Sequence, residues 1–186
     1  MDADTLALEL IAQAEALFGR MTSDWEYTGL GFSEAPPHLL YNPAHAGVMI
    51  MLSNRALKDD FQLVFQLAHE VCHLLYPAVS VDLPSEAHTT VLNEGISTFF
   101  SVLSVANYFG REAASDAIAS LENHSPKYYS AFLNVSSLLE RDPQAVRKIR
   151  SLQTMINDVT KLEVKAMLPD IADPELDILL GQFNRS

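Results

Sequence analysis

The chain has 186 residues, of which 48% are apolar and 19% are charged, and its formal net charge is −12. This length suits one domain with a sizeable core, so we expect a single domain over residues 1–186. No apolar run approaches the roughly 18 residues of a membrane span. An acidic surface repels phosphate backbones and anionic lipids, so the composition argues against nucleic acid and membrane partners.

Three local features of the sequence narrow the class of protein further. The first ten residues, MDADTLALEL, carry two early acids and no basic segment, which predicts a cytoplasmic protein without a cleaved secretory signal. The single cysteine, Cys72, excludes an internal disulfide framework and a cysteine-rich structural zinc site, and is expected to pack as a small buried residue. The one basic stretch, Arg141 to Arg150, is expected to be the solvated face of a helix.

The first half of the chain changes its pattern twice. Apolar residues at helical spacing predict an amphipathic helix over residues 4–19. From Trp25 to Leu52, glycines, prolines and the short β-prone runs EYTGLGF, HLLY and VMIML predict two or three strands with tight turns. The helical period then returns after Asn54 and persists until Pro77 ends it.

Helices are expected over most of the remaining chain. One should begin near Ser85 as N-cap and end at Phe109 before Gly110, and another should follow over residues 111–122. The pairs at 125–126, 142–143 and 173–174 each place a capping side chain before a proline, and the run TKLE at 160–163 is typical of a capping box. The predicted class is α+β, mostly α, with a small N-terminal antiparallel or mixed sheet and a C-terminal helical layer.

Residues 69–73 read His-Glu-Val-Cys-His, an H-E-x-x-H motif. On a helix, residues four apart lie one turn above each other, so His69 and His73 project from the same face and can meet one metal ion. Glu70 lies beside them and can act as a general base towards a metal-bound water. A chance occurrence in such a chain is on the order of one in a hundred.

A catalytic zinc site needs a third protein ligand and an open position. The residues after His73 are LLYPAVS, which excludes the metzincin layout, and a di-iron bundle would need a second E-x-x-H that the chain lacks. Glu94 lies 21 residues beyond His73 on the next predicted helix, with Asp82, Glu86 and His88 as rival ligands. Gly95, inside that helix, is expected to allow close packing against the His69–His73 helix.

The H-E-x-x-H motif followed by Asn-Glu-Gly at 93–95 resembles the gluzincin family of zinc peptidases, over roughly residues 57–101. The resemblance implies a zincin-like domain in which His69, His73 and Glu94 bind one Zn²⁺ and Glu70 is the base. It also implies that the strand at about 47–52 receives a peptide or protein substrate by strand addition. Thermolysin-like enzymes carry an Asp four residues after the ligand Glu, where this chain has Thr98, so the support of the first His should differ.

Gluzincin chemistry also needs a hydrogen-bond donor for the oxyanion. The candidates are Tyr108, His124, Tyr128 and Tyr129, of which Tyr128 at a predicted helix start is the first choice. The remaining histidines, His38 and His45, lie among turn residues and are expected to be ordinary surface groups.

The sequence therefore predicts a zinc-dependent metallopeptidase. The alternative is a zinc-bearing regulatory or interaction module on a gluzincin scaffold without turnover. The two differ in one structural respect: in the second, a side chain such as His88 or Asp82 fills the position that water needs.

Overall fold

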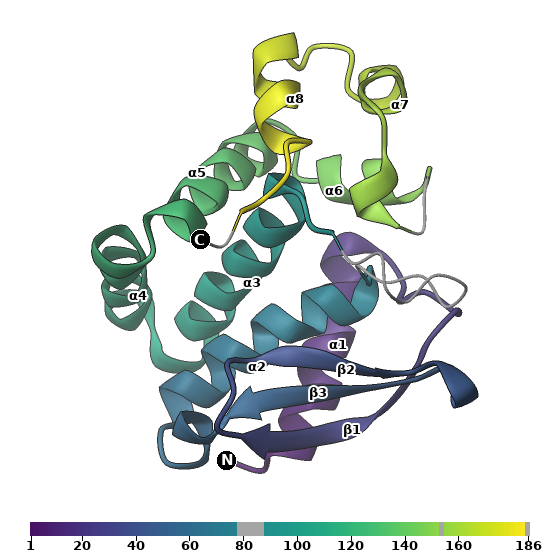
Figure 1. Ribbon diagram of the computed structural model, residues 1–186. Coiled ribbons are helices and arrows are strands. Elements are labelled where there is room, and N and C mark those ends of the chain that lie inside the picture. The colour runs from purple at the N-terminus through teal and green to yellow at the C-terminus, as the bar shows by residue number, and fades with distance from the viewer. Residues whose placement is uncertain (78–87, 153–154, 185–186) are drawn as a thin grey trace.

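The computed structural model describes residues 1–77, 88–152 and 155–184. The predictions for Asp82, Ser85 and Glu86 concern residues outside this part. The longer helices are α1 (Ala3–Phe18), α2 (Asp60–Leu75), α3 (Val91–Phe109), α4 (Arg111–His124) and α5 (Pro126–Arg141). Three shorter ones follow: α6 (Ala145–Arg150), α7 (Lys161–Met167) and α8 (Asp173–Leu179). With a three-stranded sheet beside them, the α+β, mostly α class is confirmed (Figure 1).

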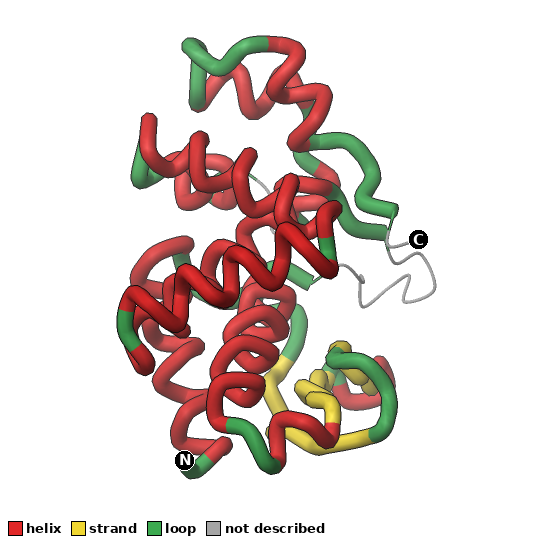
Figure 2. The backbone as a smooth tube through the Cα atoms, turned by 90° about the vertical axis from the view of Figure 1, so that its left-hand side faces the viewer, coloured by secondary structure: helices red, strands yellow, loops and turns green. Residues whose placement is uncertain are grey.

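The sheet is mixed, with the strand order β1-β3-β2. Strand β1 (Glu26–Ser33) runs parallel to β3 (Gly47–Ser53), and β2 (His38–Asn42) runs antiparallel to it on the other side. The register between β1 and β3 shifts between Tyr27 and Leu30, where Gly29 has a φ of 123°, a conformation that favours glycine. The strands gather at one end of the molecule, away from the C-terminal helices (Figure 2).

This pairing corrects the expected place of substrate addition. Strand β3, at Gly47–Ser53, has a partner along both edges, so it has no free edge to offer a peptide. The edge strands are β1 and β2.

Helix α2 forms the structural centre of the molecule. The Asp59 carboxylate caps its start by accepting hydrogen bonds from the backbone amides of Phe61 and Gln62, at 2.9 and 3.2 Å. Side chains such as Leu67 and Val71, four apart, are buried in the core. The helix ends at Leu75, shortly after the H-E-x-x-H motif, with Tyr76 as its C-cap and Pro77 next in the chain.

Helix α3 begins later than predicted. Its N-cap is Thr90, whose hydroxyl accepts a hydrogen bond from the backbone N–H of Asn93 at 3.3 Å. Glu94 therefore lies in the first turn of the helix, where the partial positive charge of the N-terminus favours a carboxylate. Pro126 lies in the first turn of α5 as predicted, although Ser125 makes no side-chain cap, and Thr160 and Glu163 form the predicted reciprocal capping box of α7. The other two proline pairs do not cap helices as predicted, because Gln144 is the N-cap of α6 and Ala172 that of α8.

The packing of Gly95 differs from expectation. A Cβ at this position would lie 2.5 Å from the carbonyl oxygen of Ala131 and 2.6 Å from Val135 Cγ2, so the close neighbour of Gly95 is α5 and not α2. Small size at Gly95 therefore brings α3 and α5 together, which places the first turn of α5 near the H-E-x-x-H motif.

We expect Gly95→Ala to destabilise the protein by about 3 kcal/mol, at the upper end of usual overpacking costs, because the clash involves backbone that no rotamer change relieves. The measurement is urea unfolding of the metal-free protein. Ser101→Ala on the same helix is the control, since its hydroxyl bonds only to the carbonyl of Ser97. A loss no larger than that of the control would contradict the close approach.

Within the basic stretch, Arg141, Arg147 and Lys148 are exposed as predicted, but Arg150 is not. The guanidinium of Arg150, half-buried, donates hydrogen bonds to the carbonyls of Phe18, Gly19 and Arg20 at 2.7–3.1 Å and to that of Leu75 at 2.9 Å. These carbonyls lie at or just after the C-terminal ends of α1 and α2, where helices lack intrahelical partners, and that of Leu75 also accepts the backbone N–H of Thr22 at 3.2 Å. Arg150 thus closes two helix ends at once, and this residue is not part of a solvated face.

Cys72 is fully buried, as predicted. Burial raises the pKa of its thiol to about 12, so the thiolate is scarce at neutral pH. We expect no alkylation of the native protein by iodoacetamide at neutral pH and one modification per chain in urea, measured by mass spectrometry. Prompt native alkylation would show that the C-terminal half of α2 opens to solvent.

Candidate metal centre

Three side chains from two helices converge on one point. His69 Nε2 lies 3.2 Å from His73 Nε2 and 3.2 Å from Glu94 Oε2, and His73 Nε2 lies 3.6 Å from the same oxygen. The histidines come from α2 and the carboxylate from the first turn of α3. Of the two proposed third ligands within the described residues, Glu94 and His88, Glu94 is the one that lies beside the histidine pair.

The chemistry and spacing of this group fit a zinc ion. Two imidazoles and one carboxylate are a usual donor set for catalytic zinc. Donor atoms about 2.0–2.1 Å from a tetrahedral ion lie about 3.3–3.4 Å from one another, and the three observed separations, 3.2, 3.2 and 3.6 Å, fall on either side of that value. Little movement of the ligands would be needed for binding.

The charge state of Glu94 suits a ligand. Its side chain is fully buried, and burial alone opposes ionisation. The charge of His73 and hydrogen bonds with His69 and His73 outweigh that penalty and hold the pKa of the Glu94 carboxyl well below its ordinary value. A buried carboxylate that stays ionised is a ready ligand for a cation.

The two histidines are supported differently. Asn93 Oδ1 lies 3.0 Å from His73 Nδ1, and Asn93 is held in turn by the side chain of Asn157. For His69, no hydrogen bond to Nδ1 joins it to any of residues 1–77, 88–152 or 155–184. The Thr98 hydroxyl donates to the backbone carbonyl of Glu94 at 2.8 Å. The expected difference at Thr98 is thus seen in the contacts of His69.

Sequence reasoning assigned no role to Asn93 or Asn157. The position of Asn93 beside the ligand Glu94 was a usable signal, because an amide at the start of a helix that carries a ligand is within reach of the same site. Asn157 lies in a 3₁₀ turn, η3 (Ile156–Asp158), 64 residues further along, and nothing local in its sequence points to the site.

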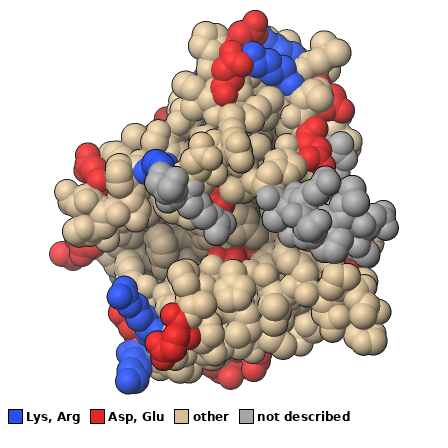
Figure 3. All heavy atoms as spheres, viewed as in Figure 1, with Lys and Arg blue, Asp and Glu red and all other residues tan. Residues whose placement is uncertain are grey.

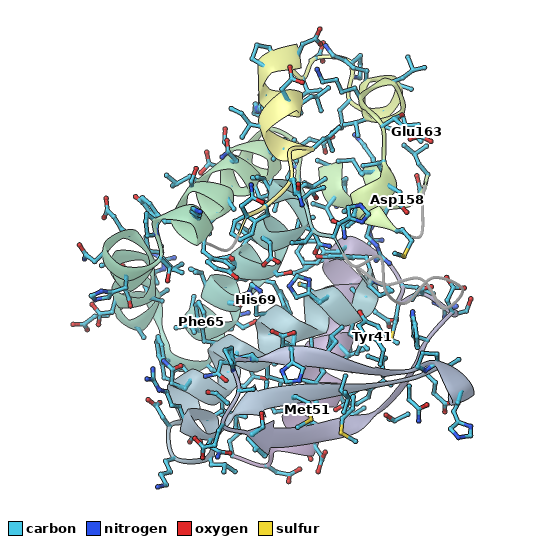
Figure 4. All side chains as sticks on the ribbon, in the orientation of Figure 1. Tyr41, Met51, Phe65, His69, Asp158 and Glu163 are labelled. Carbon is cyan, nitrogen blue, oxygen red and sulfur yellow. The ribbon has the colours of Figure 1, made fainter. Side chains whose placement is uncertain are left out.

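A cleft of about 360 Å³ opens beside the ligands. Its lining includes four side chains from α2 and two from the helices facing it: Phe65, Gln66, His69, Glu70, Leu121 and Tyr128. Phe65 and His69 project from α2 toward the side of α4 and α5 (Figure 4). The same face of the molecule is hollowed between the sheet and these helices, with acidic atoms visible inside (Figure 3).

Glu70 lines this cleft with only 4% of its surface exposed. It is the second residue of the H-E-x-x-H motif, and it does not belong to the group of three residues whose ligand atoms converge. The structure thus separates the roles that the sequence predicted, with Glu94 among the donor atoms and Glu70 on the wall of the cleft.

Of the four candidate oxyanion donors, Tyr128 lies in the cleft. Its ring centroid is 5.9 Å from that of His69 and 4.9 Å from that of Phe183. The Tyr108 hydroxyl donates instead to Glu9 at 2.9 Å on the surface. Tyr129 and His124 are not part of the cleft wall, and His124 is exposed.

The remaining histidines lie away from the converging ligands. His88 Nε2 lies 3.3 Å from Asp158 Oδ1 and 3.4 Å from the carbonyl of Asn157, so the rival ligand His88 pairs elsewhere. His45 is exposed, and His38 contacts the carbonyl of Pro36, as expected for surface groups. No helix in the part of the chain that the structure describes is long and apolar enough to cross a membrane.

Comparison with protein-family models, with curated proteins and with solved structures returns no match for this chain.

Proposed function

We propose that this protein is a zinc-dependent peptidase of gluzincin type, which hydrolyses peptide bonds with Glu70 as general base. The observation that carries the proposal is the triangle of ligand atoms from His69, His73 and Glu94, of which His69 also lines a cleft that contains Glu70. A structural zinc site has four protein ligands, whereas three ligands beside an open cleft are the arrangement of catalytic sites.

His69, His73 and Glu94 would hold the ion. When bound there, zinc supplies Lewis acidity, which polarises a carbonyl and makes a water molecule more acidic. The carboxylate of Glu94 and the two neutral imidazoles leave one positive charge on the site, and this charge attracts a developing oxyanion.

Glu70 accepts the proton of the attacking water in this proposal. Its carboxylate follows directly after one ligand in the sequence and lines the cleft, so it reaches the reacting atoms without binding the metal. The protonated Glu70 can then donate to the amine that leaves, which completes the transfer within one side chain.

Tyr128 is the proposed oxyanion donor. It lies in the first turn of α5 and lines the same cleft, with its ring centroid 5.9 Å from that of His69. The close packing of Gly95 against α5 fixes the distance between α3 and that turn. A phenolic hydroxyl donates one hydrogen bond, which is what an oxyanion beside a Lewis acid requires.

A peptide fits the cleft better than a small polar molecule. The lining of the cleft includes the apolar or aromatic side chains of Phe65, Leu121 and Tyr128. Pro36 and Pro37, directly before β2, also line it, so the edge of the sheet that adjoins the cleft is that of β2. An extended peptide backbone can pair with such an edge while its side chains enter the cleft.

The alternative, a zinc-bearing module without turnover, would be favoured by a protein side chain in the open position. His88 was one side chain proposed to fill it, and it contacts Asp158 and the backbone of Asn157 instead. His88 therefore does not fill the open position, and Asp82, the other side chain proposed for it, lies outside the described residues.

The deciding experiment combines metal analysis with a cleavage screen. We expect about one zinc per chain after dialysis, and cleavage of a mixed-sequence peptide library that stops with a chelator and returns with added zinc. Bound zinc without cleavage of any peptide would support the non-catalytic module, and a chain that binds no zinc would refute both.

A further inference from the structure

Asn157 makes an unusual set of hydrogen bonds for a residue in a short turn. It is 7% exposed, and its Oδ1 accepts from the backbone N–H of Thr90, the hydroxyl of Thr90 and the Nδ2 of Asn93, at 3.1, 3.1 and 3.0 Å. Its Nδ2 donates to the carbonyl of His88 at 2.9 Å. One side chain from η3 thus joins the start of α3 to the residues just before it.

The orientation of this amide follows from its backbone partners. The Thr90 backbone N–H can only donate, so the atom of Asn157 that faces it must be the oxygen. The His88 backbone carbonyl can only accept, so the atom that faces it must be the NH₂ group. The two ends of the Asn157 amide are therefore assigned without ambiguity.

The orientation of the Asn157 amide also determines which ring nitrogen of His73 carries the hydrogen. Because Asn157 offers its oxygen, Asn93 must face it with its NH₂ group and turn its own oxygen to His73 Nδ1, 3.0 Å away. An amide oxygen accepts, so Nδ1 must carry the hydrogen. Neutral imidazole has one N–H, and the lone pair of His73 is therefore on Nε2, the atom that faces Glu94 and His69.

We propose that Asn157 is a positioning residue of the metal centre, which acts through Asn93 to keep His73 in the tautomer that binds metal. The proposal rests on the proposed metal site. Without Asn157, Asn93 could turn its amide over with almost no change of shape and offer NH₂ to His73 Nδ1. His73 would then be favoured with its hydrogen on Nε2, where it blocks coordination.

The test uses two substitutions of Asn157 and a neighbouring control. Asn157→Leu removes every bond to Thr90 and Asn93. Asn157→Asp keeps an oxygen that accepts from both, and replaces the bond to His88 with a second oxygen facing the His88 carbonyl. Asp158→Asn changes an exposed neighbour that pairs with His88 and does not touch Asn93. Asn157→Ser, too short to reach Asn93, replaces the Leu variant if that variant does not fold.

The first measurement is zinc affinity by competition with a chromophoric chelator. We expect Asn157→Leu to bind zinc about 10–100-fold more weakly than wild type, the usual effect of losing the residues that orient a ligand. Asn157→Asp and Asp158→Asn should stay close to wild type. A purely structural role predicts instead that affinity follows melting temperature across all variants, and that result would overturn the proposal.

The second measurement reports on His73 directly. The ¹⁵N shifts of its ring in metal-free protein, at alkaline pH where the imidazole is neutral, should show hydrogen on Nδ1 in wild type and in Asn157→Asp. In Asn157→Leu the form with hydrogen on Nε2 should become substantial. An unchanged tautomer in that variant would refute the inference.

The two measurements separate this inference from the proposed function. A wild-type protein that binds zinc and cleaves no peptide would end the peptidase proposal and leave the affinity comparison decisive here. If wild type binds no zinc, the proposed metal site fails, and the tautomer comparison still decides whether Asn157 controls His73.

Discussion

Replacing Glu70 with Gln is expected to slow peptide cleavage by about 10²–10⁴-fold, the usual contribution of a general base, while zinc stays bound. The amide has nearly the same shape as the carboxylate and cannot accept the proton. Glu70 lines the cleft and is outside the group of converging ligand atoms, so its loss should leave the metal content unchanged. The measurement is kcat/KM on a substrate found in the library screen, with zinc determined on the same sample.

The matched variant is His73→Ala, which removes a ligand instead of the base. It should lose both zinc and cleavage, and it should be less stable than metal-free wild type, because the buried Glu94 carboxylate and Asn93 each lose a partner. Equal cleavage by Glu70→Gln and wild type would show that the base is another group. Loss of zinc from Glu70→Gln would place Glu70 among the ligands.

Replacing Arg150 with Met is expected to lower the free energy of unfolding by at least about 3 kcal/mol. Several carbonyls at helix ends would lose a charged donor, and some of these carbonyls are partly buried, so water cannot fully replace it. The methionine fills much of the same space, so the loss would come from the hydrogen bonds and not from a cavity. Guanidinium planarity matters too: one group reaches Phe18, Gly19, Arg20 and Leu75 together, which a lysine ammonium cannot do.

Arg147→Met provides the control for this prediction. Arg147 donates to the carbonyls of Glu15 and Ala16 near the end of the same helix, but it is exposed, so water can replace its bonds. The comparison is made by urea unfolding of the metal-free proteins. Similar losses in the two variants would show that closing the ends of α1 and α2 contributes little.

Much of the site was predictable because its first part is local. Two histidines four apart on a strongly periodic helix must share a face, whatever the rest of the chain does. The Asn-Glu-Gly segment lies on the next helix along the chain, and two consecutive helices usually pack together, which brought Glu94 to the pair. The helix start with Pro126 was also local, and it placed Tyr128 correctly at the beginning of α5.

Two of the errors concern contacts between distant parts of the chain, and a third concerns the start of a helix. A strand run such as VMIML shows that a strand exists but not which neighbours it has, and β3 proved to be central. A glycine within a helix signals a close approach without naming the partner, and the partner of Gly95 is α5. Thr90 rather than Ser85 caps α3, because several polar residues before a helix can compete for that role.

Polar residues with long-range roles gave the weakest signals. Arg150 belongs to a stretch whose charges suggested an exposed face, yet its guanidinium turns inward to carbonyls more than 130 positions earlier in the chain. Asn157 is one polar residue in a turn without periodicity. In both cases the role depends on which backbone groups the fold leaves unsatisfied at that point, and this is known only once the helices are in place.

The bonds of Arg150 also set an order of events during biosynthesis. Its partner carbonyl at the end of α2, that of Leu75, is made 75 residues earlier. At a translation rate of about 5–20 residues per second, roughly 4–15 s pass between the two, and the nascent chain carries both histidines throughout that interval without this closure of the helix end. A ribosome-bound chain halted before Arg150 should therefore hold zinc more weakly than the released protein, however complete its H-E-x-x-H motif.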